Sequence, residues 1–212
     1  GVMVRLVEDT SALGQPDLII LPGTKATIAD LEWLRGKGLD TAIAAVATTE
    51  HATVLGLCGG YQMLGRTITD PIEACRETPV AGLGWLPVDT VFEPEKITRQ
   101  RRGRALGQRV TGYQIHHGRT ISSNQPWITF DDAYGQGPDG AEHDHVFGTS
   151  LHGLFEEDGF RAAFLTHVAA RRGKRFKFTG VSFEAAREAQ IDRLADLLEN
   201  HLDLNAVRAL LS

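Results

Sequence analysis

A short apolar run that ends at a cysteine between glycines constrains the fold of this 212-residue chain more than any other feature. Thr53 to Leu57 (TVLGL) has the length and composition of a buried strand, Cys58-Gly59-Gly60 follows directly, and a helical pattern runs from Tyr61 to Gly65. A residue at such a junction lies in a tight, strained turn, because strand and helix approach closely there. Gly56 and Gly60 provide the room that this turn needs. The pattern G-x-C-x-G therefore predicts a strand–turn–helix unit with the cysteine at its apex.

The preceding residues predict an α/β fold with a parallel sheet. Asp17 to Leu21 (DLIIL) is a continuous apolar run that ends at Pro22-Gly23, as is typical of a strand buried on both faces. Val2 to Val7 is rich in β-branched residues and is predicted as another strand. Helices are expected from Ile28 to Leu34 and from Thr41 to Thr49. This alternation favours parallel strands with crossover helices.

The rest of the chain predicts further strands and then two helices. Gly, Pro and Asp residues, which favour turns, separate the predicted strands. The strands are Trp85 to Phe92, Val110 to His116, Ile128 to Phe130 and Val146 to Ser150. Residues 135–144 (GQGPDGAEHD) are predicted as an exposed loop. Helices are expected from Asp158 to Arg172 and from Ser182 to His201, with Ser182 as a plain N-cap. A single α/β domain over residues 1–212 is the simplest organisation.

Composition excludes several classes of function. The chain has 42% apolar and 23% charged residues, as ordinary soluble proteins do. Its net charge of -5, without a long basic stretch, gives no support for nucleic-acid binding. No apolar run approaches the roughly 18 residues of a membrane span, and no signal peptide is recognisable. Two cysteines fit a reducing cytoplasm. Because the chain starts at Gly1, almost inside a strand-like segment, a fragment of a longer polypeptide is expected.

The predicted turn gives Cys58 the setting of a nucleophile. It lifts the sulfur above the carboxyl ends of the strands, where open α/β sheets bind ligands. It points the thiol at a helix N-terminus, which favours the thiolate, and it leaves the backbone N–H of Gly59 free to stabilise an oxyanion. The alternative is that Cys58 is a small buried hydrophobe, as most cysteines are, and the two flanking glycines argue against it. Cys75 has no such setting and is interpreted as a structural or free thiol.

The run GLCGGYQMLG (56–65) resembles the signature of the class I, triad-type glutamine amidotransferases. The resemblance implies a flavodoxin-like fold, a mostly parallel sheet flanked by helices, and attack of Cys58 on the side-chain amide of glutamine. It places Gln62, with its neighbour Tyr61, at the substrate. Ile19 to Gly23 (IILPG) resembles the oxyanion strand of this family, so that a backbone amide at Gly23 or Thr24 would face the sulfur together with Gly59.

Four further segments resemble the C-terminal glutaminase domain of the cobyric acid synthase branch; they are 21–31, 94–100, 112–120 and 148–155. The resemblance implies that ammonia released here passes to an N-terminal, ATP-dependent synthetase domain, where four peripheral carboxylates of adenosylcobyrinic acid a,c-diamide become amides. A G-x-x-x-x-G-K-[ST] loop is absent from the sequence, so the ATP-binding half is missing. No cofactor is expected in this domain, and ATP and Mg belong to the missing one.

His152 follows the strand-like VFGTSL and is identified through the same resemblance as the base that accepts the thiol proton and later protonates ammonia. Many class I members carry a glutamate two residues after this histidine, but Leu154 occupies that position here, so the triad is reduced to a dyad. Glu156 could orient the His152 ring or cap the helix near Asp158, and the cap is favoured. A backbone carbonyl or water could hold the ring instead.

Three weaker signals remain open. Residues 98–104 (TRQRRGR) are either a solvated basic loop or a surface for the synthetase domain, with Arg99 as a contact for the glutamine carboxylate. His116 and His117 lie in GYQIHHG, where relatives read GYEIH, so Gln114 argues against a charge-dependent role; a plain strand is equally favoured. His143 and His145 with these histidines could suggest zinc, but no cysteine or acidic ligand stands at a characteristic spacing, so no metal is expected.

Three other interpretations are less favoured than a glutaminase. A related enzyme of the same branch, such as an a,c-diamide synthase or a cell-wall amidating partner, is disfavoured by 94–100 (PEKITRQ). A cysteine peptidase or glyoxalase-like protein could use the same turn, but Gln62 and the ILPG strand favour glutamine. A catalytically idle interaction scaffold is disfavoured because both Cys58 and His152 are present.

Overall fold

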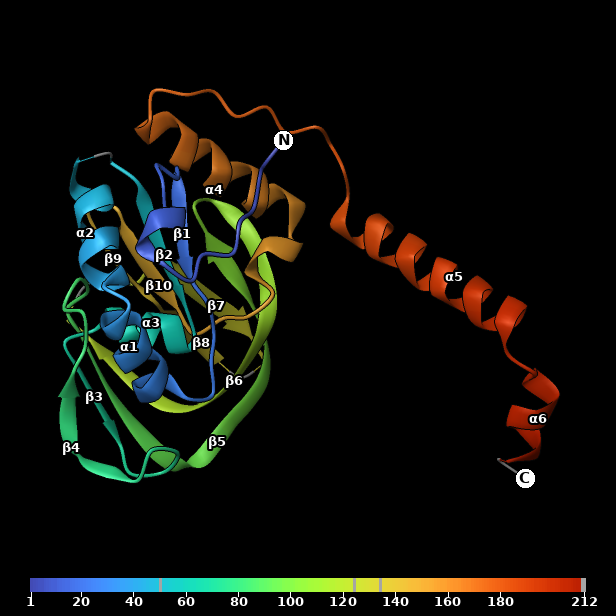
Figure 1. Cartoon of the computed structure of the whole chain (residues 1–212), viewed down its shortest axis with the longest axis horizontal. Coiled ribbons are helices and arrows are strands. Elements are labelled where there is room, and N and C mark those ends of the chain that lie inside the picture. Colours follow the sequence, from blue (N-terminus) through green and yellow to red (C-terminus); the bar gives the residue numbers. More distant parts are fainter. Residues whose placement is uncertain (50, 124, 134, 211–212) are drawn as a thin grey trace. The chain divides into compact units, whose positions relative to one another are not determined.

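The computed structural model describes residues 1–49, 51–123, 125–133 and 135–210 (Figure 1). The chain divides into two compact units, Gly1–Lys177 and Phe178–Ser212. The single domain predicted for residues 1–212 stays a prediction.

The first sheet of unit 1 contains four strands in the order β1-β2-β10-β9. Strands β1 (Leu18–Leu21), β2 (Thr53–Leu57) and β10 (Val146–Thr149) are parallel, and β9 (Ala141–His143) runs antiparallel to β10. Every residue of β10 is buried, which agrees with its apolar run. The predicted parallel sheet is therefore confirmed.

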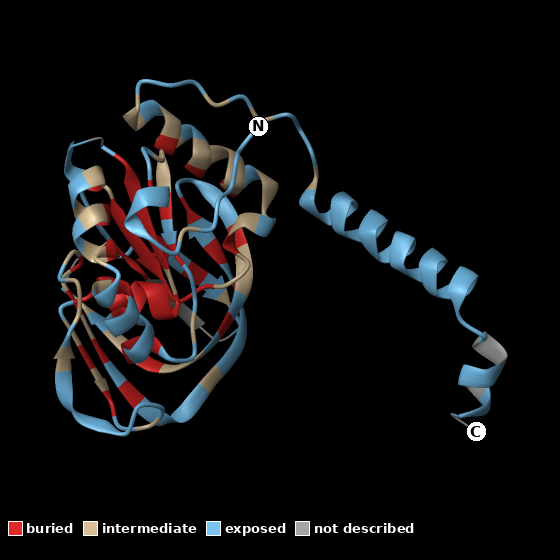
Figure 2. Cartoon of the chain, in the orientation of Figure 1, coloured by how far each residue is buried: buried red, intermediate tan, exposed pale blue. Residues whose placement is uncertain are grey.

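Helices cover both faces of this sheet. Adjacent side chains of β2 point to opposite faces: Val54 joins an apolar cluster with Ile43 of α2 (Leu39–Thr49), and Leu55 joins another with Phe160 and Phe164 of α4 (Asp158–Arg171). The first face also carries α1 (Thr27–Gly36), and α3 (Gly59–Leu64) follows β2 directly. Two short 3-10 turns, η1 (Thr10–Ala12) and η2 (Leu154–Glu156), lie in connections. In Figure 2 the strands of this sheet and α3 are mostly coloured as buried.

A second sheet, ordered β4-β3-β5-β7-β8, carries the other wall of the site. Its strands are β3 (Thr67–Asp70), β4 (Arg76–Ala81), β5 (Val88–Ala105), β7 (Ile128–Asp132) and β8 (Gly135–Asp139); β6 (Gln108–Ser122) also pairs with β5. The long β5–β6 hairpin has an irregularity between Phe92 and Ile97. It bends the hairpin and brings its middle close to the first sheet.

Two local predictions are wrong, and one of the two alternatives left open for residues 98–104 is excluded. Residues 98–104 are not a loop but part of β5, because pairing with β6 and β7 satisfies their backbone, and Arg101 is buried against Asp132 at 2.8 Å. Residues 135–143 are not a loop either: they form β8 and β9, joined at Gly140, whose φ of +78° suits glycine, and Asp144 alone of the predicted loop lies in a turn. Residues 2–7 form no strand, because β-branched composition makes a strand only where a neighbour accepts its hydrogen bonds.

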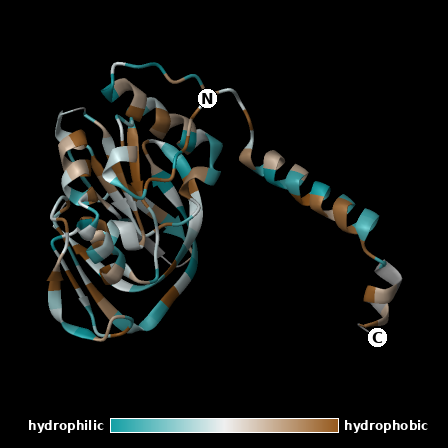
Figure 3. Ribbon diagram, in the orientation of Figure 1, coloured by the Kyte–Doolittle hydropathy of each residue, from teal (hydrophilic) through white to brown (hydrophobic). Residues whose placement is uncertain are grey.

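Unit 2 consists of α5 (Phe183–His201) and α6 (Leu204–Ala209). Ser182 caps α5 by accepting a hydrogen bond from the N–H of Ala185 at 3.3 Å, so the predicted N-cap is confirmed. None of the described residues of α5 is buried, and Figure 3 shows apolar and polar residues alternating along it. In the described part of the chain, no helix is long and apolar enough to cross a membrane.

Candidate active site

Three neighbouring parallel strands deliver the predicted catalytic groups to one edge of the first sheet. Gly23 follows β1, Cys58 follows β2 directly, and His152 follows β10. The strands are in register, with Gly56 opposite both Leu21 and Gly148. Because carboxyl ends of parallel strands share an edge, residues distant in the sequence converge there.

Cys58 lies in the predicted strained turn. Its backbone has φ 50° and ψ -106°, in a left-handed region that non-glycine residues rarely adopt. A methyl group on Gly56 would lie 2.7 Å from the carbonyl oxygen of Gly60, and one on Gly60 would lie 2.0 Å from the carbonyl oxygen of Leu21. Both flanking glycines are thus required by close backbone contacts. The N–H of Cys58 donates to the carbonyl of Thr149 at 2.8 Å and ties the turn to β10.

The side chains of Cys58 and His152 meet beside Gly23. A methyl group placed on Gly23 would lie 3.0 Å from Cε1 of His152 and 3.5 Å from Cβ of Cys58. The imidazole and the thiol therefore flank the same glycine, as a nucleophile and its base must.

Backbone donors for an oxyanion lie at the same place. The N–H of Gly59 hydrogen bonds to the sulfur of Cys58. Among the described residues, nothing accepts a hydrogen bond from the N–H groups of Gly23 and Thr24. These three groups lie next to Cys58 and come from two elements, the loop after β1 and the start of α3, which approach each other at Thr24 and Gly59. Such an arrangement can stabilise negative charge that develops on a substrate oxygen.

Burial is the main influence on the pKa values of Cys58 and His152. Burial raises the pKa of the Cys58 thiol, and the N–H of Gly59 opposes this shift only in part. Among nearby charges, Glu73 and Asp139 raise this pKa and Lys96 lowers it. Burial lowers the pKa of His152, so its imidazole is neutral and able to accept a proton at neutral pH. Burial thus opposes the effect of the helix N-terminus on the Cys58 thiol, which agrees with the expected need for His152 as a base.

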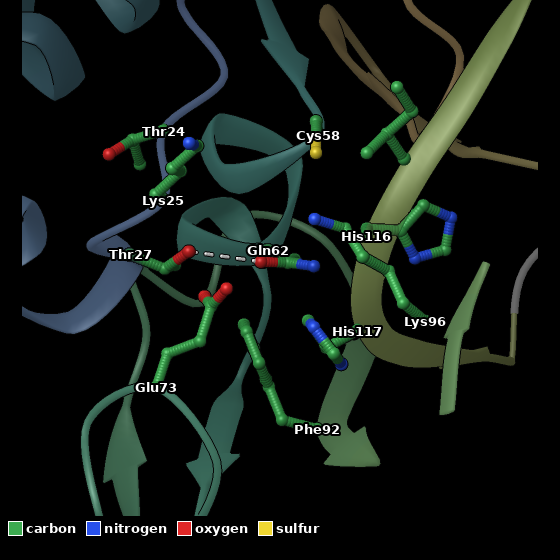
Figure 4. Close-up of a pocket in the computed structure, with 11 residues that line it drawn as sticks. Thr24, Lys25, Thr27, Cys58, Gln62, Glu73, Phe92, Lys96, His116 and His117 are labelled. Atoms are coloured by element: carbon green, nitrogen blue, oxygen red, sulfur yellow. Dashed lines mark hydrogen bonds between the residues drawn. The ribbon is translucent and has the colours of Figure 1, made fainter. Parts of the chain in front are cut away.

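A cleft opens beside Cys58 (Figure 4). Gln62 lines it, and its Oε1 accepts a hydrogen bond from Oγ1 of Thr27 at 3.1 Å. That bond occupies the acceptor oxygen of Gln62, so the NH₂ of its side chain is the group that can donate to a ligand. Figure 4 shows the carboxylate of Glu73 on the Thr27 side and the amino group of Lys96 reaching from β5 toward Cys58.

Two predicted substrate contacts lie elsewhere. Tyr61 is only 1% exposed and belongs to the core, where a methyl group on Gly148 would lie 2.0 Å from its ring; its predicted role at the substrate is wrong. Arg99 is exposed on β5 and is not among the residues that line the cleft. The segment 94–100 does contribute to the cleft, but through Lys96.

The histidines of β6 also line the cleft. Nδ1 of His116 lies 2.7 Å from the carbonyl oxygen of Gly118, and Nδ1 of His117 lies 2.9 Å from that of Glu93. Burial lowers the pKa of His116. In the described part of the chain, no group of three or more histidine, cysteine or acidic side chains gathers as metal ligands would.

A buried network of polar side chains holds the segment of the chain that precedes His152, and the sequence did not predict it. The carboxylate of Asp139 accepts hydrogen bonds from the hydroxyls of Thr149 and Ser150, from the N–H of Ser150 at 3.2 Å and from Nε2 of Gln114 at 3.3 Å. Gln114 also donates to Oγ of Ser150 at 2.6 Å. A glutamate at 114 would face Asp139 with like charge, which explains the amide here. The network fixes the two residues that precede Leu151 and His152.

Glu156 does not cap α4. The N-cap residue of this helix is Glu157, which makes no side-chain capping bond, so the favoured interpretation is wrong. Glu156 ends η2, and its Oε1 would lie 3.4 Å from a methyl group on Gly153, next to His152.

Comparisons with known proteins agree with this geometry. Residues 1–160 match the family described as the CobB/CobQ-like glutamine amidotransferase domain. The chain is 46% identical over 209 residues to cobyric acid synthase of Streptomyces coelicolor, covering 98% of this chain and 39% of that protein. It is 48% identical over 210 residues to cobyric acid synthase of Mycobacterium marinum, covering 98% and 40%.

A solved structure described as a glutamine amidotransferase is similar in fold, with a TM-score of 0.56, 16% identity, and coverage of 80% of this chain and 87% of that one. The chain spans about 40% of the length of the curated relatives above. Its cysteine turn, the facing histidine and the match over residues 1–160 lead to one conclusion: the chain belongs to the CobB/CobQ-like glutamine amidotransferase domain family.

Proposed function

We propose that this chain is the glutaminase part of a cobyric acid synthase and hydrolyses L-glutamine to glutamate and ammonia. The observation that carries the proposal is the convergence of Cys58, His152 and unpaired backbone N–H groups on Gly23. The relatives above, at 46% and 48% identity, are cobyric acid synthases and support this branch over the other enzymes of the family.

Each group has a step in the proposed reaction. Neutral His152 takes the proton of Cys58 as the sulfur attacks the amide carbon of glutamine. The N–H groups of Gly23 and Gly59 bind the oxyanion of the tetrahedral intermediate. The imidazolium then protonates the leaving nitrogen, and ammonia departs as the C–N bond breaks. Water, deprotonated by His152, hydrolyses the thioester and releases glutamate with the thiol restored.

The charges of the cleft support an amino acid as the substrate. Glu73, Lys25 and Lys96 line it, and within the described residues none of their side chains makes a hydrogen bond or ion pair. Free charges of both signs suit the α-ammonium and α-carboxylate of glutamine while its amide lies at Cys58. Gln62 lines the same cleft, and this position supports a role for it in holding the substrate.

We further propose that the ammonia is used by the larger remainder of the enzyme. Because the chain spans about 40% of relatives such as that of Mycobacterium marinum, an ATP-dependent synthetase region with Mg would lie outside it. That region would amidate peripheral carboxylates of a corrinoid. A cytoplasmic location stays a prediction from the two free cysteines.

The test is glutamate release by the purified chain, together with labelling by a glutamine-like diazo ketone. We expect the reagent to modify Cys58, 7% exposed inside the cleft, and to spare Cys75, which is exposed but lies outside it. Cys58→Ala should abolish hydrolysis and leave the melting temperature nearly unchanged. Labelling of Cys75 instead, or hydrolysis by Cys58→Ala, would contradict the proposal.

A further inference from the structure

The ring of His152 lies against the ring of Tyr113. The two rings are stacked, with centroids 5.1 Å apart and planes inclined by 6°. Tyr113 is 43% exposed, so it is not held there as part of the hydrophobic core. This contact covers one face of the imidazole next to Cys58.

The backbones of the two residues are paired as well. The N–H of His152 donates to the carbonyl of Tyr113 at 2.8 Å, and the N–H of Tyr113 donates to the carbonyl of His152 at 3.1 Å. This is an isolated antiparallel bridge between β6 and the segment after β10. A methyl group on Gly112 would lie 2.0 Å from the carbonyl oxygen of His152, so glycine is needed for this approach. The bridge fixes the Cα atoms, and the stacking fixes the ring plane.

The ring of His152 has little other support. Within the described residues, no group hydrogen bonds to its nitrogens. Cys58 of the turn lies beside it, His116 of β6 interacts with it electrostatically, and the carboxylate of Glu156 in η2 lies near the adjoining Gly153. When His152 takes the thiol proton, the cation forms in a partly buried site where burial disfavours charge. An aromatic face next to a cation stabilises it.

We propose that Tyr113 is the positioning residue of the catalytic dyad: its ring orients His152 toward Cys58 and stabilises the imidazolium that forms during catalysis. The aromatic face of Tyr113 makes the contact that has this effect, and its hydroxyl group is not required. This role rests on the proposed glutaminase function, in which His152 is the base.

The experiment follows the alkylation of Cys58 by iodoacetamide, which requires neither glutamine nor turnover. Only the thiolate reacts, so the rate against pH reports the thiolate–imidazolium pair. The background is Cys75→Ser in the full 212-residue chain, because Cys75 is exposed and would react. Tyr113→Phe retains the ring, Tyr113→Leu removes it, and His152→Ala defines the rate without a base. Ile121→Ala, 68% exposed on the same strand, is the matched control.

We expect Tyr113→Phe and Ile121→Ala to alkylate within about twofold of the background protein. Tyr113→Leu should react roughly tenfold more slowly at pH 7, from the size of aromatic and cation–π contacts, with the midpoint of the pH profile moved upward toward that of His152→Ala. Glutamine hydrolysis should fall mainly in kcat. If Tyr113→Leu lowers the melting temperature, Tyr113→Trp, which restores a ring face, should recover the rate.

Two results would overturn the proposal: an unchanged profile in Tyr113→Leu, or equal loss in Tyr113→Phe and Tyr113→Leu. Failure of the glutaminase proposal looks different. In that case the background protein releases no glutamate, and His152→Ala leaves the alkylation profile unchanged.

Discussion

Replacing Gly60 with alanine tests whether the cysteine turn and the oxyanion loop are one mechanical unit. The new methyl group would lie 2.0 Å from the carbonyl oxygen of Leu21 and 2.5 Å from its carbon, both backbone atoms. To reach an ordinary contact, the backbone at Leu21 or α3 must move by about 1 Å, which a close-packed interior resists. Leu21 is paired with Gly56, and Gly60 donates to Pro22, so both elements are strained.

The expected loss is about 3 kcal/mol, the upper part of the range for overpacking, because the clash is with backbone. For a chain of this size it corresponds to a melting temperature lower by roughly 6–12 °C. Since Gly23 follows Leu21 by two residues, the N–H donors also move, and labelling of Cys58 by the diazo ketone should slow by at least about tenfold.

The matched control is Gly36→Ala at the end of α1, where a methyl group meets nothing within 4 Å. This variant should be unchanged or more stable by up to about 1 kcal/mol, and should label at the normal rate. Circular dichroism melting and mass spectrometry give the two readouts. A Gly60→Ala variant that melts within about 2 °C of the parent and labels normally would refute the reasoning.

Other substitutions and pH test the chemistry directly. His152→Ala should lower the rate of glutamine hydrolysis by at least about 10³-fold, as removal of a base does in other nucleophile–base pairs; a loss under tenfold would remove His152 from the mechanism. Glu73→Gln should raise KM for glutamine by roughly 10- to 100-fold with kcat little changed, because a charged hydrogen bond to the substrate is lost; steady-state kinetics would disprove this contact if KM stayed the same. The acid limb of kcat/KM should lie below pH 6.5, because burial lowers the pKa of His152 and only its neutral form accepts a proton; a limb above 6.5 would contradict that assignment.

The cysteine turn could be predicted because its causes are local. An apolar run that ends at Gly-x-Cys-x-Gly requires close backbone contacts on both sides of Cys58, and the structure has them at Gly56 and Gly60. The parallel order of β1 and β2 followed from two short apolar runs with a helical pattern between them. Such features depend on neighbours in the sequence.

The residues that complete the site depend on distant pairing and were not predictable in the same way. Tyr113 reaches His152 only because β6 forms a bridge with the segment after β10. Asp139 lies in a stretch whose glycines and aspartates are typical of a loop, and its role appears only with Thr149 and Ser150 beside it. Arg101 looks like a surface charge in TRQRRGR, yet Asp132, 31 residues later, makes its burial possible.

The position of β1 in its sheet has a consequence for how the enzyme would lose function. Within the described residues β1 has a hydrogen-bonded neighbour on one side only, β2, and Gly23 lies two residues after its end. Outer strands fray at lower free energy than the strands they cover. Glutaminase activity should therefore be lost at a lower urea concentration than the helices and the central strands. In mild urea the reactivity of Cys58 would fall while the far-ultraviolet circular dichroism signal stays unchanged.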